Sequence, residues 1–200
     1  MAPRVAIIVY SLYGHIGALA EATKAGIESV GGKATIFQVP ETLSPEILTI
    51  LHAPPKPDYA IATNDTLKEH DAFLFGLPTR YGTYPSQWKS FWDGTGALWG
   101  SGALIGKTAG IFVSTGTPQG GQETTALNSL SVLVHHGINY IPLGYRAFPQ
   151  QTTFDEFHGG SPWGAGTFAG ADGSRQVTKL EKEIAETQGS SFYKIVEKLY

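Results

Sequence analysis

The 200-residue sequence contains no cysteine. Disulfides, thiolate metal sites and thiol redox chemistry are therefore excluded, and any redox role needs a bound cofactor. The sequence also lacks a large excess of charge of either sign. It has 14 Lys and Arg residues and 17 Asp and Glu residues, which gives a formal net charge of −3. A chain so close to neutral gives no reason to expect nucleic acid or an anionic membrane as a partner.

Long apolar runs are also missing. The N-terminal run at residues 5–10 is too short for the core of a signal peptide. No run approaches the roughly 18 apolar residues that a transmembrane segment requires. We therefore expect a soluble cytoplasmic protein, and a chain of this length suits one domain spanning residues 1–200.

Apolar runs alternate with helical patterns along the first three quarters of the chain. Five runs predict strands, at residues 4–10, 33–39, 70–78, 107–115 and 138–145. Helices are expected between them, at residues 16–30, 44–51, 85–99 and 122–137. This alternation predicts an α/β fold, a flavodoxin-like three-layer sandwich with a five-stranded parallel sheet in the order 2-1-3-4-5.

The last quarter of the chain has a different character. Residues 146–176 show little periodicity and are rich in glycine and aromatic side chains. A long segment of this kind usually forms a binding loop or an interface, so we expect a loop that covers a site or contacts another chain. A final helix is predicted over residues 177–199.

Three loops follow strands and should meet at one edge of the sheet, where α/β proteins bind ligands. The first contains Ser11, Leu12, Tyr13, Gly14, His15 and Ile16. A hydroxyl, a glycine and a helix start in this order can form a cradle of backbone N–H groups for a phosphate. The dinucleotide motif G-x-G-x-x-G and the P-loop motif are both absent.

The other two loops suit a flat ring. The second contains Pro78, Thr79, Arg80, Tyr81 and Gly82. The third contains Ser114, Thr115, Gly116, Thr117, Pro118, Gln119, Gly120 and Gly121. Its glycines allow a planar ligand to approach the backbone closely. A phosphate cradle beside two such loops fits flavin mononucleotide (FMN) better than NAD, because the first loop lacks an acidic residue that would bind a ribose.

Six stretches of the chain resemble one family. They are SLYGHI, PTRYG, GALWGSGAL.GK, STGTPQGGQE, HHG...PLGY and GG.PWGA...AG.DGSRQ. Together they are similar, in order and over nearly the whole chain, to the WrbA-type NAD(P)H:quinone oxidoreductases, with the fungal benzoquinone reductases nearest. The resemblance implies noncovalent FMN, a homotetramer or homodimer, and two-electron reduction of quinones such as 1,4-benzoquinone to hydroquinones by NADH or NADPH.

The same resemblance implies roles for individual positions. Residues 11–16 would hold the phosphate, 79–82 the ribityl chain and one flavin edge, and 114–120 the other edge. Tyr13 matches a nicotinamide-contact position, Trp99 a substrate-contact position and His135 a position in the FMN pocket, although His135 and its neighbour His136 could be exchanged. The sequence departs from the family at Pro118-Gln119 and at Tyr81, which replaces a frequent phenylalanine.

The resulting hypothesis is a ping-pong reaction in which hydride passes through flavin N5, with Tyr81, Trp99 and His135 as the catalytic group. The proton for the quinone oxygen would come from His135, Tyr81 or water. The alternatives are a one-electron flavodoxin-type carrier and an FMN-binding regulatory protein without turnover. Balanced charge argues against the carrier, and the lack of a basic patch argues against nucleic-acid regulation. We expect no metal site, because adjacent helical histidines point about 100° apart.

Overall fold

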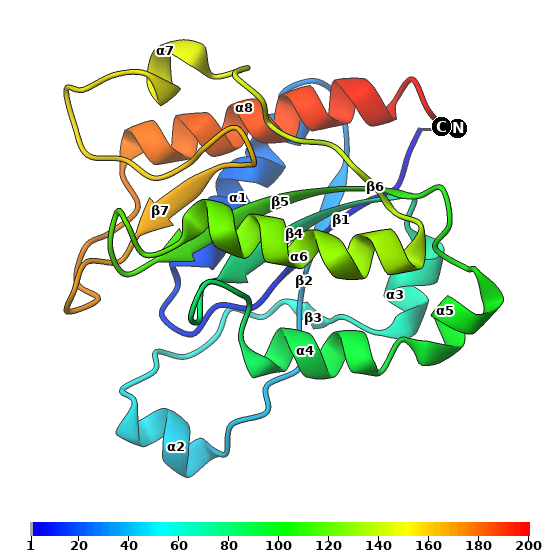
Figure 1. Cartoon of the computed structure of the whole chain (residues 1–200), viewed down its shortest axis with the longest axis horizontal. Helices are drawn as coiled ribbons and strands as arrows, with labels where there is room; N and C mark the ends of the chain where they lie inside the picture. The colour runs from blue at the N-terminus through cyan, green and yellow to red at the C-terminus, as the bar shows by residue number, and fades with distance from the viewer. Residues whose placement is uncertain (1) are drawn as a thin grey trace.

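The computed structural model of the chain describes residues 2–200. Its centre is a parallel sheet in the order β3-β2-β1-β4-β5-β6, and a further strand, β7, also pairs with β5 (Figure 1). The strands are β1 (Val5–Val9), β2 (Ala34–Gln38), β3 (Ala60–Ile61), β4 (Ala72–Pro78), β5 (Thr108–Thr115), β6 (Asn139–Tyr140) and β7 (Gly166–Phe168). The five expected strands occur in the predicted order, and β3 and β7 are two short additions.

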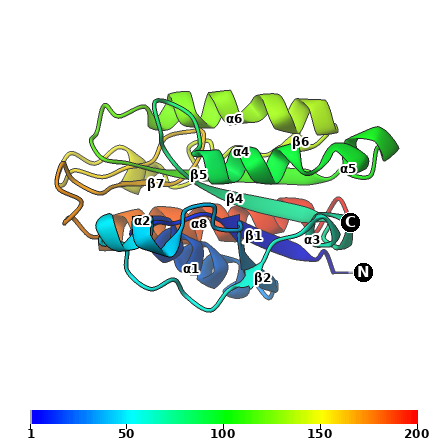
Figure 2. The ribbon, with the colours of Figure 1, turned by 90° about the horizontal axis from the view of Figure 1, so that it is seen from below.

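Helices cover both faces of the sheet (Figure 2). They are α1 (His15–Glu28), α2 (Pro45–Ile50), α3 (Asn64–Glu69), α4 (Ser86–Asp93), α5 (Gly96–Ser101), α6 (Gln122–His136), α7 (Phe148–Gln151) and α8 (Lys179–Val196). Helices α1 and α8 pack on one face, and α4 and α6 on the other. This three-layer arrangement confirms the flavodoxin-like fold class. None of the helices in residues 2–200 is both long and apolar enough to cross a membrane.

Strand β1 shows why the sheet is buried on both sides. All five of its residues are buried. Ile7 belongs to the apolar cluster beneath α1 and α8, whereas Ile8 belongs to the cluster that contains Trp88 of α4. Successive side chains of a strand point to opposite faces. A continuous apolar run therefore serves both layers and holds the end of β1 in a fixed place.

Two glycines let α1 and α8 approach each other closely. A Cβ on Gly26 of α1 would lie 2.0 Å from the carbonyl oxygen of Glu186. A Cβ on Gly189 of α8 would lie 2.0 Å from the carbonyl oxygen of Thr23. No side chain fits at either position, so the contact of the first and last helices depends on both glycines.

Several elements differ from the sequence-based expectation. The helix expected over residues 85–99 is broken into α4 and α5, because the chain turns at Gly94 and Thr95. Helix α3 was not expected. The helix expected over residues 177–199 begins with a capping box between Thr178 and Glu181 and ends at Val196.

The largest difference concerns the edge strand and residues 146–176. The strand expected over 138–145 ends after Tyr140, and Ile141 N–H still donates to Ala109 at 2.8 Å. The next residue, Pro142, has no N–H to continue the ladder. The chain then leaves the sheet, forms α7, and returns as β7, which pairs with the far end of β5. Residues 146–176 therefore contain a helix and a strand, and β7 ends at the same edge as β1, β4 and β5.

Candidate functional site

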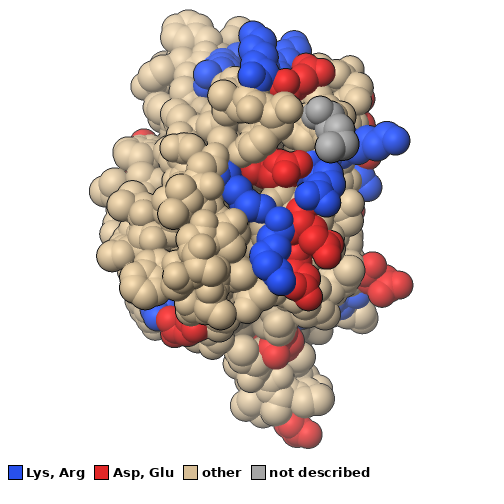
Figure 3. Space-filling model, turned by 90° about the vertical axis from the view of Figure 1, so that its right-hand side faces the viewer, with Lys and Arg blue, Asp and Glu red and all other residues tan. Residues whose placement is uncertain are grey.

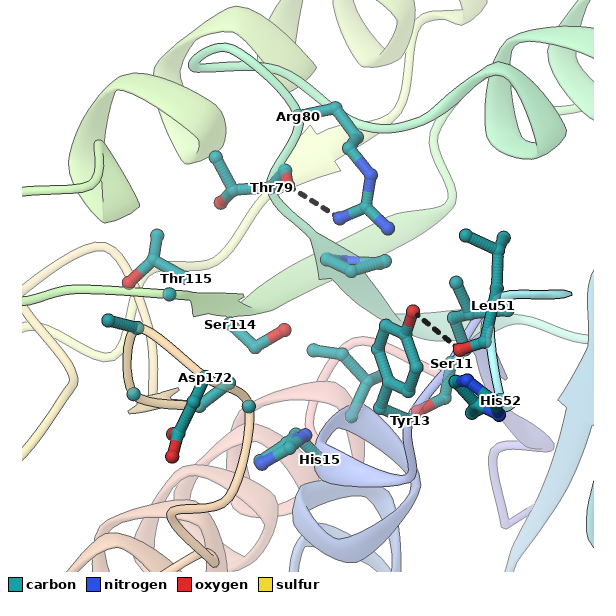
Figure 4. Close-up of a pocket in the computed structure, with 18 residues that line it drawn as sticks. Ser11, Tyr13, His15, Leu51, His52, Thr79, Arg80, Ser114, Thr115 and Asp172 are labelled. Atoms are coloured by element: carbon teal, nitrogen blue, oxygen red, sulfur yellow. Dashed lines mark hydrogen bonds between the residues drawn. The ribbon is translucent and has the colours of Figure 1, made fainter. Parts of the chain in front are cut away.

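A cavity of about 600 Å³ opens at this edge of the sheet (Figure 4). It lies among the loops that follow β1, β4, β5 and β7, with the end of α2 on one side. The lining residues are Ser11, Leu12, Tyr13, His15, Ile16, Leu51, His52, Pro78, Thr79, Arg80, Ser114, Thr115, Gly116, Ala169, Gly170, Ala171, Asp172 and Gly173. The three loops expected from the sequence therefore meet around one cavity, and a fourth loop joins them.

The first loop forms a cradle of backbone donors at the start of α1. Ser11 Oγ accepts from Gly14 N–H at 3.1 Å and from Gly17 N–H at 3.4 Å. Gly14 has a φ of 92°, which a side chain would disfavour. In residues 2–200, the N–H groups of His15 and Ile16 have no acceptor. Free N–H groups at a helix N-terminus are a ready site for an anion.

The second loop is a tight turn at the end of β4. Thr79 N–H donates to Ser114 O at 2.8 Å, and the Thr79 and Thr125 hydroxyls lie 2.9 Å apart. Arg80 and Thr83 pair on either side of a two-residue turn, in which Tyr81 and Gly82 have φ values of 52° and 76°. This turn therefore presents the side chain of Tyr81 to solvent.

Tyr81 and Gly82 do not line the first cavity. Tyr81 is fully exposed and lines a neighbouring cavity of about 530 Å³ with Tyr13 and Arg80. Arg80 and Tyr13 border both cavities. Figure 4 shows them on the side of the site that Leu51 and His52 approach. The two cavities therefore adjoin each other across these side chains.

Only the start of the third loop reaches the cavity. Ser114, Thr115 and Gly116 line it, and Thr115 Oγ1 donates to Thr117 O at 2.8 Å. Thr117, Pro118, Gln119 and Gly120 are exposed beyond the rim, and Gly121 caps α6 without lining the cavity. Gly14 likewise belongs to the cradle without lining this cavity.

Trp99 and His135 lie elsewhere in the chain. Trp99 is on α5 and is 61% exposed. His135 is exposed in the last turn of α6, a helix that begins beside the cavity and runs about 20 Å away from it. Neither residue lines either cavity. Within one chain the proposed catalytic group of Tyr81, Trp99 and His135 is therefore not assembled.

His136 is the buried member of the histidine pair. Thr95 Oγ1 donates to Trp92 O at 2.6 Å, so this hydroxyl accepts from His136 Nε2 at 2.9 Å. In residues 2–200, Nδ1 of His136 is buried without a partner. Burial, followed by the neighbouring His135, lowers the pKa of His136. A neutral ring is therefore built into the junction of α4, α5 and α6.

Two groups of lining residues were not expected from the sequence. Leu51 and His52 follow α2, and Tyr13 Oη donates to Leu51 O at 3.2 Å. Residues 169–173 follow β7, and His15 Nε2 donates to Arg175 O at 2.6 Å beside them. The strand-like stretch GTF before AGADG was the available signal for this fourth loop.

A half-buried carboxylate ties the α2 segment to the sheet beside the second cavity. Glu41 accepts from Tyr10 Oη at 3.1 Å, from Lys56 Nζ at 2.5 Å and from Gln87 Nε2 at 3.3 Å. Burial alone would raise the pKa of Glu41, but hydrogen bonds from Lys56 and from backbone N–H groups outweigh it and lower the pKa. Burial and the Glu41 charge raise the pKa of Tyr10. The cluster stays ionised and anchors both ends of the α2 segment.

The chain matches one protein family and is similar to several known proteins. The family described as NADPH-dependent FMN reductase matches residues 3–153. The chain is 69% identical to the NAD(P)H quinone oxidoreductase PST3 of Candida albicans, over 99% of this chain and 100% of that protein. It is 63% identical to Protoplast secreted protein 2 of Saccharomyces cerevisiae, over 98% and 99% of the two chains. The flavodoxin, WrbA-like protein of Agrobacterium tumefaciens has the same fold, with a TM-score of 0.67 at 21% identity over 98% of both chains.

Proposed function

The chain belongs to the family of NADPH-dependent FMN reductases, and from this we propose that it binds FMN noncovalently and reduces quinones to hydroquinones with NADH or NADPH. One observation carries the proposal. A cradle of backbone N–H groups at the start of α1, which have no acceptor among residues 2–200, opens into a cavity of about 600 Å³ that three further loops enclose. Such a cavity has the size of a small-molecule site.

The residues present fit FMN part by part. The N–H groups of His15 and Ile16 would hold the phosphate without any cation. Thr79 would hold the ribityl chain, and Thr115 with Gly116 would border the ring system. The uncharged cradle explains why no lysine is needed near Ser11. The residues 117–121 and Tyr81–Gly82 would contact the ring only from outside the rim.

Bound FMN would supply the redox centre that takes two electrons from the nicotinamide and passes them to the quinone. The side chains of Tyr13 and Tyr81 would orient flat substrates beside it, since aromatic contacts add about 0.5–1.5 kcal/mol each. Arg80, on the border of the two cavities, would attract anionic groups of the donor. Both substrates would use the same face in turn, which is a ping-pong scheme.

The test begins with purified protein. It should bind FMN with a defined stoichiometry and turn yellow, and it should oxidise NADH only when 1,4-benzoquinone is added. Double-reciprocal plots at several quinone concentrations should be parallel. A folded protein that fails to take up FMN would rule out the proposal, and intersecting plots would rule out the ping-pong scheme alone.

We propose that Trp99 and His135 contribute to the site only when two or more copies of the chain form an oligomer. If they act on substrate or cofactor, they act on the site of another chain, because neither lines the two adjoining cavities of the candidate site. Trp99, Ile105 and Val134 leave 61%, 72% and 74% of their surfaces exposed near the ends of α5 and α6. A homotetramer or homodimer would cover these side chains. The proton donor would then be His135 of a second copy, Tyr81 or water.

A further inference from the structure

We propose that Arg175 and Glu181 are positioning residues, whose ion pair, with Glu181 fully buried and Arg175 half-buried, holds the loop 169–173 against His15 and so completes the wall of the FMN site. The inference rests on the proposed FMN function. It concerns residues outside the three loops that the sequence assigned to the cofactor. It makes the C-terminal part of the chain, rather than the N-terminal loop alone, responsible for the geometry of the cradle.

Glu181 is the fixed point of this arrangement. It lies in the first turn of α8 and has no exposed surface. Its carboxylate accepts from Gly159 N–H at 2.9 Å, from Thr167 Oγ1 at 2.7 Å and from Thr178 N–H at 2.9 Å. A buried carboxylate with this many donors has one orientation, so it can position a partner precisely enough to matter for a neighbouring site.

Arg175 is the partner that Glu181 holds. Its Nη1 and Nη2 both lie 3.1 Å from the Glu181 carboxylate, one from each oxygen. The same guanidinium donates to Phe168 O at 2.9 Å and to Phe157 O at 3.0 Å. The planar fork of arginine satisfies all these acceptors at once, which the single ammonium of lysine does not.

The backbone of Arg175 transmits this position to the cavity. Arg175 N–H donates to Ala169 O at 2.9 Å, which closes the loop 169–175 on itself. Arg175 O accepts from His15 Nε2 at 2.6 Å. Because a carbonyl only accepts, Nε2 of His15 must carry a hydrogen. The bond therefore fixes both the tautomer and the orientation of the first residue of α1, whose own N–H is one of the free donors of the cradle.

The side of the loop that faces the cavity is small and mostly uncharged. Ala169, Gly170, Ala171 and Gly173 line the cavity, and the carboxylate of Asp172 is engaged by Ser174 N–H and Oγ at 3.1 and 2.8 Å. Such a surface contacts a ligand through its shape and its backbone groups, and not through charged side chains. Its contribution therefore depends on its position, and the Arg175–Glu181 pair sets that position.

The experiment compares three variants of the full chain with the wild type. Arg175→Gln with Glu181→Gln removes both charges together, because removal of one partner alone would leave a buried charge uncompensated. Arg175→Lys keeps the charge and loses the fork. Arg146→Gln is the matched control, because Arg146 Nη1 also binds two backbone carbonyls, of Pro142 at 2.9 Å and Leu143 at 2.7 Å, but none of its partners lines the cavity.

Three quantities are measured: the FMN dissociation constant of apoprotein, the ³¹P shift of bound FMN and the ¹⁵N signals of the His15 ring. We expect the double variant to bind FMN about tenfold more weakly, the effect of losing one well-placed hydrogen bond. Its ³¹P signal should shift, and its His15 Nε2–H signal should be lost to tautomer exchange. Arg175→Lys should lie between the double variant and the wild type. Arg146→Gln should lower only the melting temperature.

Two results would overturn the inference. One is an unchanged FMN affinity and ³¹P shift in a folded double variant, or in Arg175→Lys if the double variant does not fold. The other is an equal loss of affinity in Arg146→Gln, which would mean that any loss of stability weakens the site. If wild-type protein does not bind FMN, the proposed function fails by itself. The His15 signals would still show whether the ion pair positions that ring.

Discussion

Tyr81 carries the clearest local strain in the site. Of the non-glycine residues 2–200, only His52 and Tyr81 have a positive φ. A left-handed conformation costs a side chain about 1–2 kcal/mol. Tyr81 recovers none of this by burial, because its side chain is fully exposed. A bulky residue at the tip of such a turn is therefore explained better by contact with a ligand or a second chain than by folding.

Replacing this tyrosine should separate stability from activity. Tyr81→Gly should stabilise the fold by about 1 kcal/mol, because glycine adopts a positive φ without strain. This corresponds to a rise of about 2–4 °C in the melting temperature. The KM for benzoquinone should rise severalfold through the loss of about 0.5–1.5 kcal/mol of ring contact. Thermal unfolding of apoprotein and steady-state kinetics measure the two effects.

Phe154→Gly is the matched control. Phe154 is as exposed as Tyr81 but has no positive φ. Glycine there should only add freedom to the unfolded chain, so the melting temperature should fall slightly and the KM should stay constant. A lower melting temperature for Tyr81→Gly would show that the turn is not strained.

At the scale of elements, the junction of α4, α5 and α6 depends on a neutral histidine. Protonation of His136 would place an N–H on Nδ1, which has no acceptor in residues 2–200. Its pKa is lowered in the folded chain, chiefly by burial. The unfolded chain therefore binds the proton more readily, and acid favours unfolding.

The stability of the protein should thus fall as the pH drops below about 6.5, the ordinary value for histidine. Above that pH, His136 makes its full contribution to the free energy of unfolding. This contribution is lost as the pH approaches the lowered pKa that His136 has in the folded chain. His136→Gln should flatten this part of the pH profile of urea unfolding. His135→Gln should keep most of the slope, because the charge of His135 is only the second cause. Equal slopes in wild type and His136→Gln would assign the acid sensitivity to other groups.

The contact of α1 and α8 should tolerate no side chain at Gly189. Gly189→Ala should destabilise the apoprotein by about 1–3 kcal/mol or more, since the methyl group would meet the backbone of Thr23. Gly17→Ala in α1 is the control, because a Cβ there meets nothing within 4 Å. Alanine should raise helix stability at this position by about 0.5–1 kcal/mol. Chemical unfolding measures the stability of both variants. An unchanged free energy of unfolding in Gly189→Ala would mean that the helices can move apart.

Particular elements show what the sequence could and could not predict. The buried runs of β1, β4 and β5 predicted the sheet and the edge where their loops meet, because strand direction alone determines that edge. Pro142 could have predicted the end of the edge strand. No local pattern predicted that the chain would return to pair with β5 about 25 residues later. Leu51 and the loop 169–173 reach the cavity through long-range contacts, of Tyr13 with Leu51 and of His15 with Arg175, which no local pattern encodes.

At the scale of the whole molecule, charge and apolar surface are separated. Figure 3 shows Lys, Arg, Asp and Glu gathered in one half of a face, while the half that carries the α4–α6 layer has almost none. Helix α6 exposes Leu127 and Val134, and Glu123 is its only acidic or basic residue apart from its histidines. An apolar surface with little charge is typical of an interface between chains.

Mixed assemblies should reveal sites shared between chains. Ser11→Asp puts a negative charge into the cradle and should abolish FMN binding, whereas Trp99→Ala leaves the cradle intact. Each variant alone should have little quinone reductase activity. Co-expressed and purified through two different tags, the mixed oligomer should be more active than either, because intact cradles then meet intact tryptophans. Activity that stays at the level of the separate variants would show that Trp99 does not act on a second chain.

The bond between His15 and Arg175 joins residues 160 positions apart. Strands β1, β2, β4 and β5 can pair early, but the closure of so long a loop is slow and comes late in folding. Docking of α8 onto α1 should therefore be among the last folding events. Partly folded chains would have a sheet without a finished cradle, so they should not capture the flavin. Cofactor uptake would then report that a chain has finished folding.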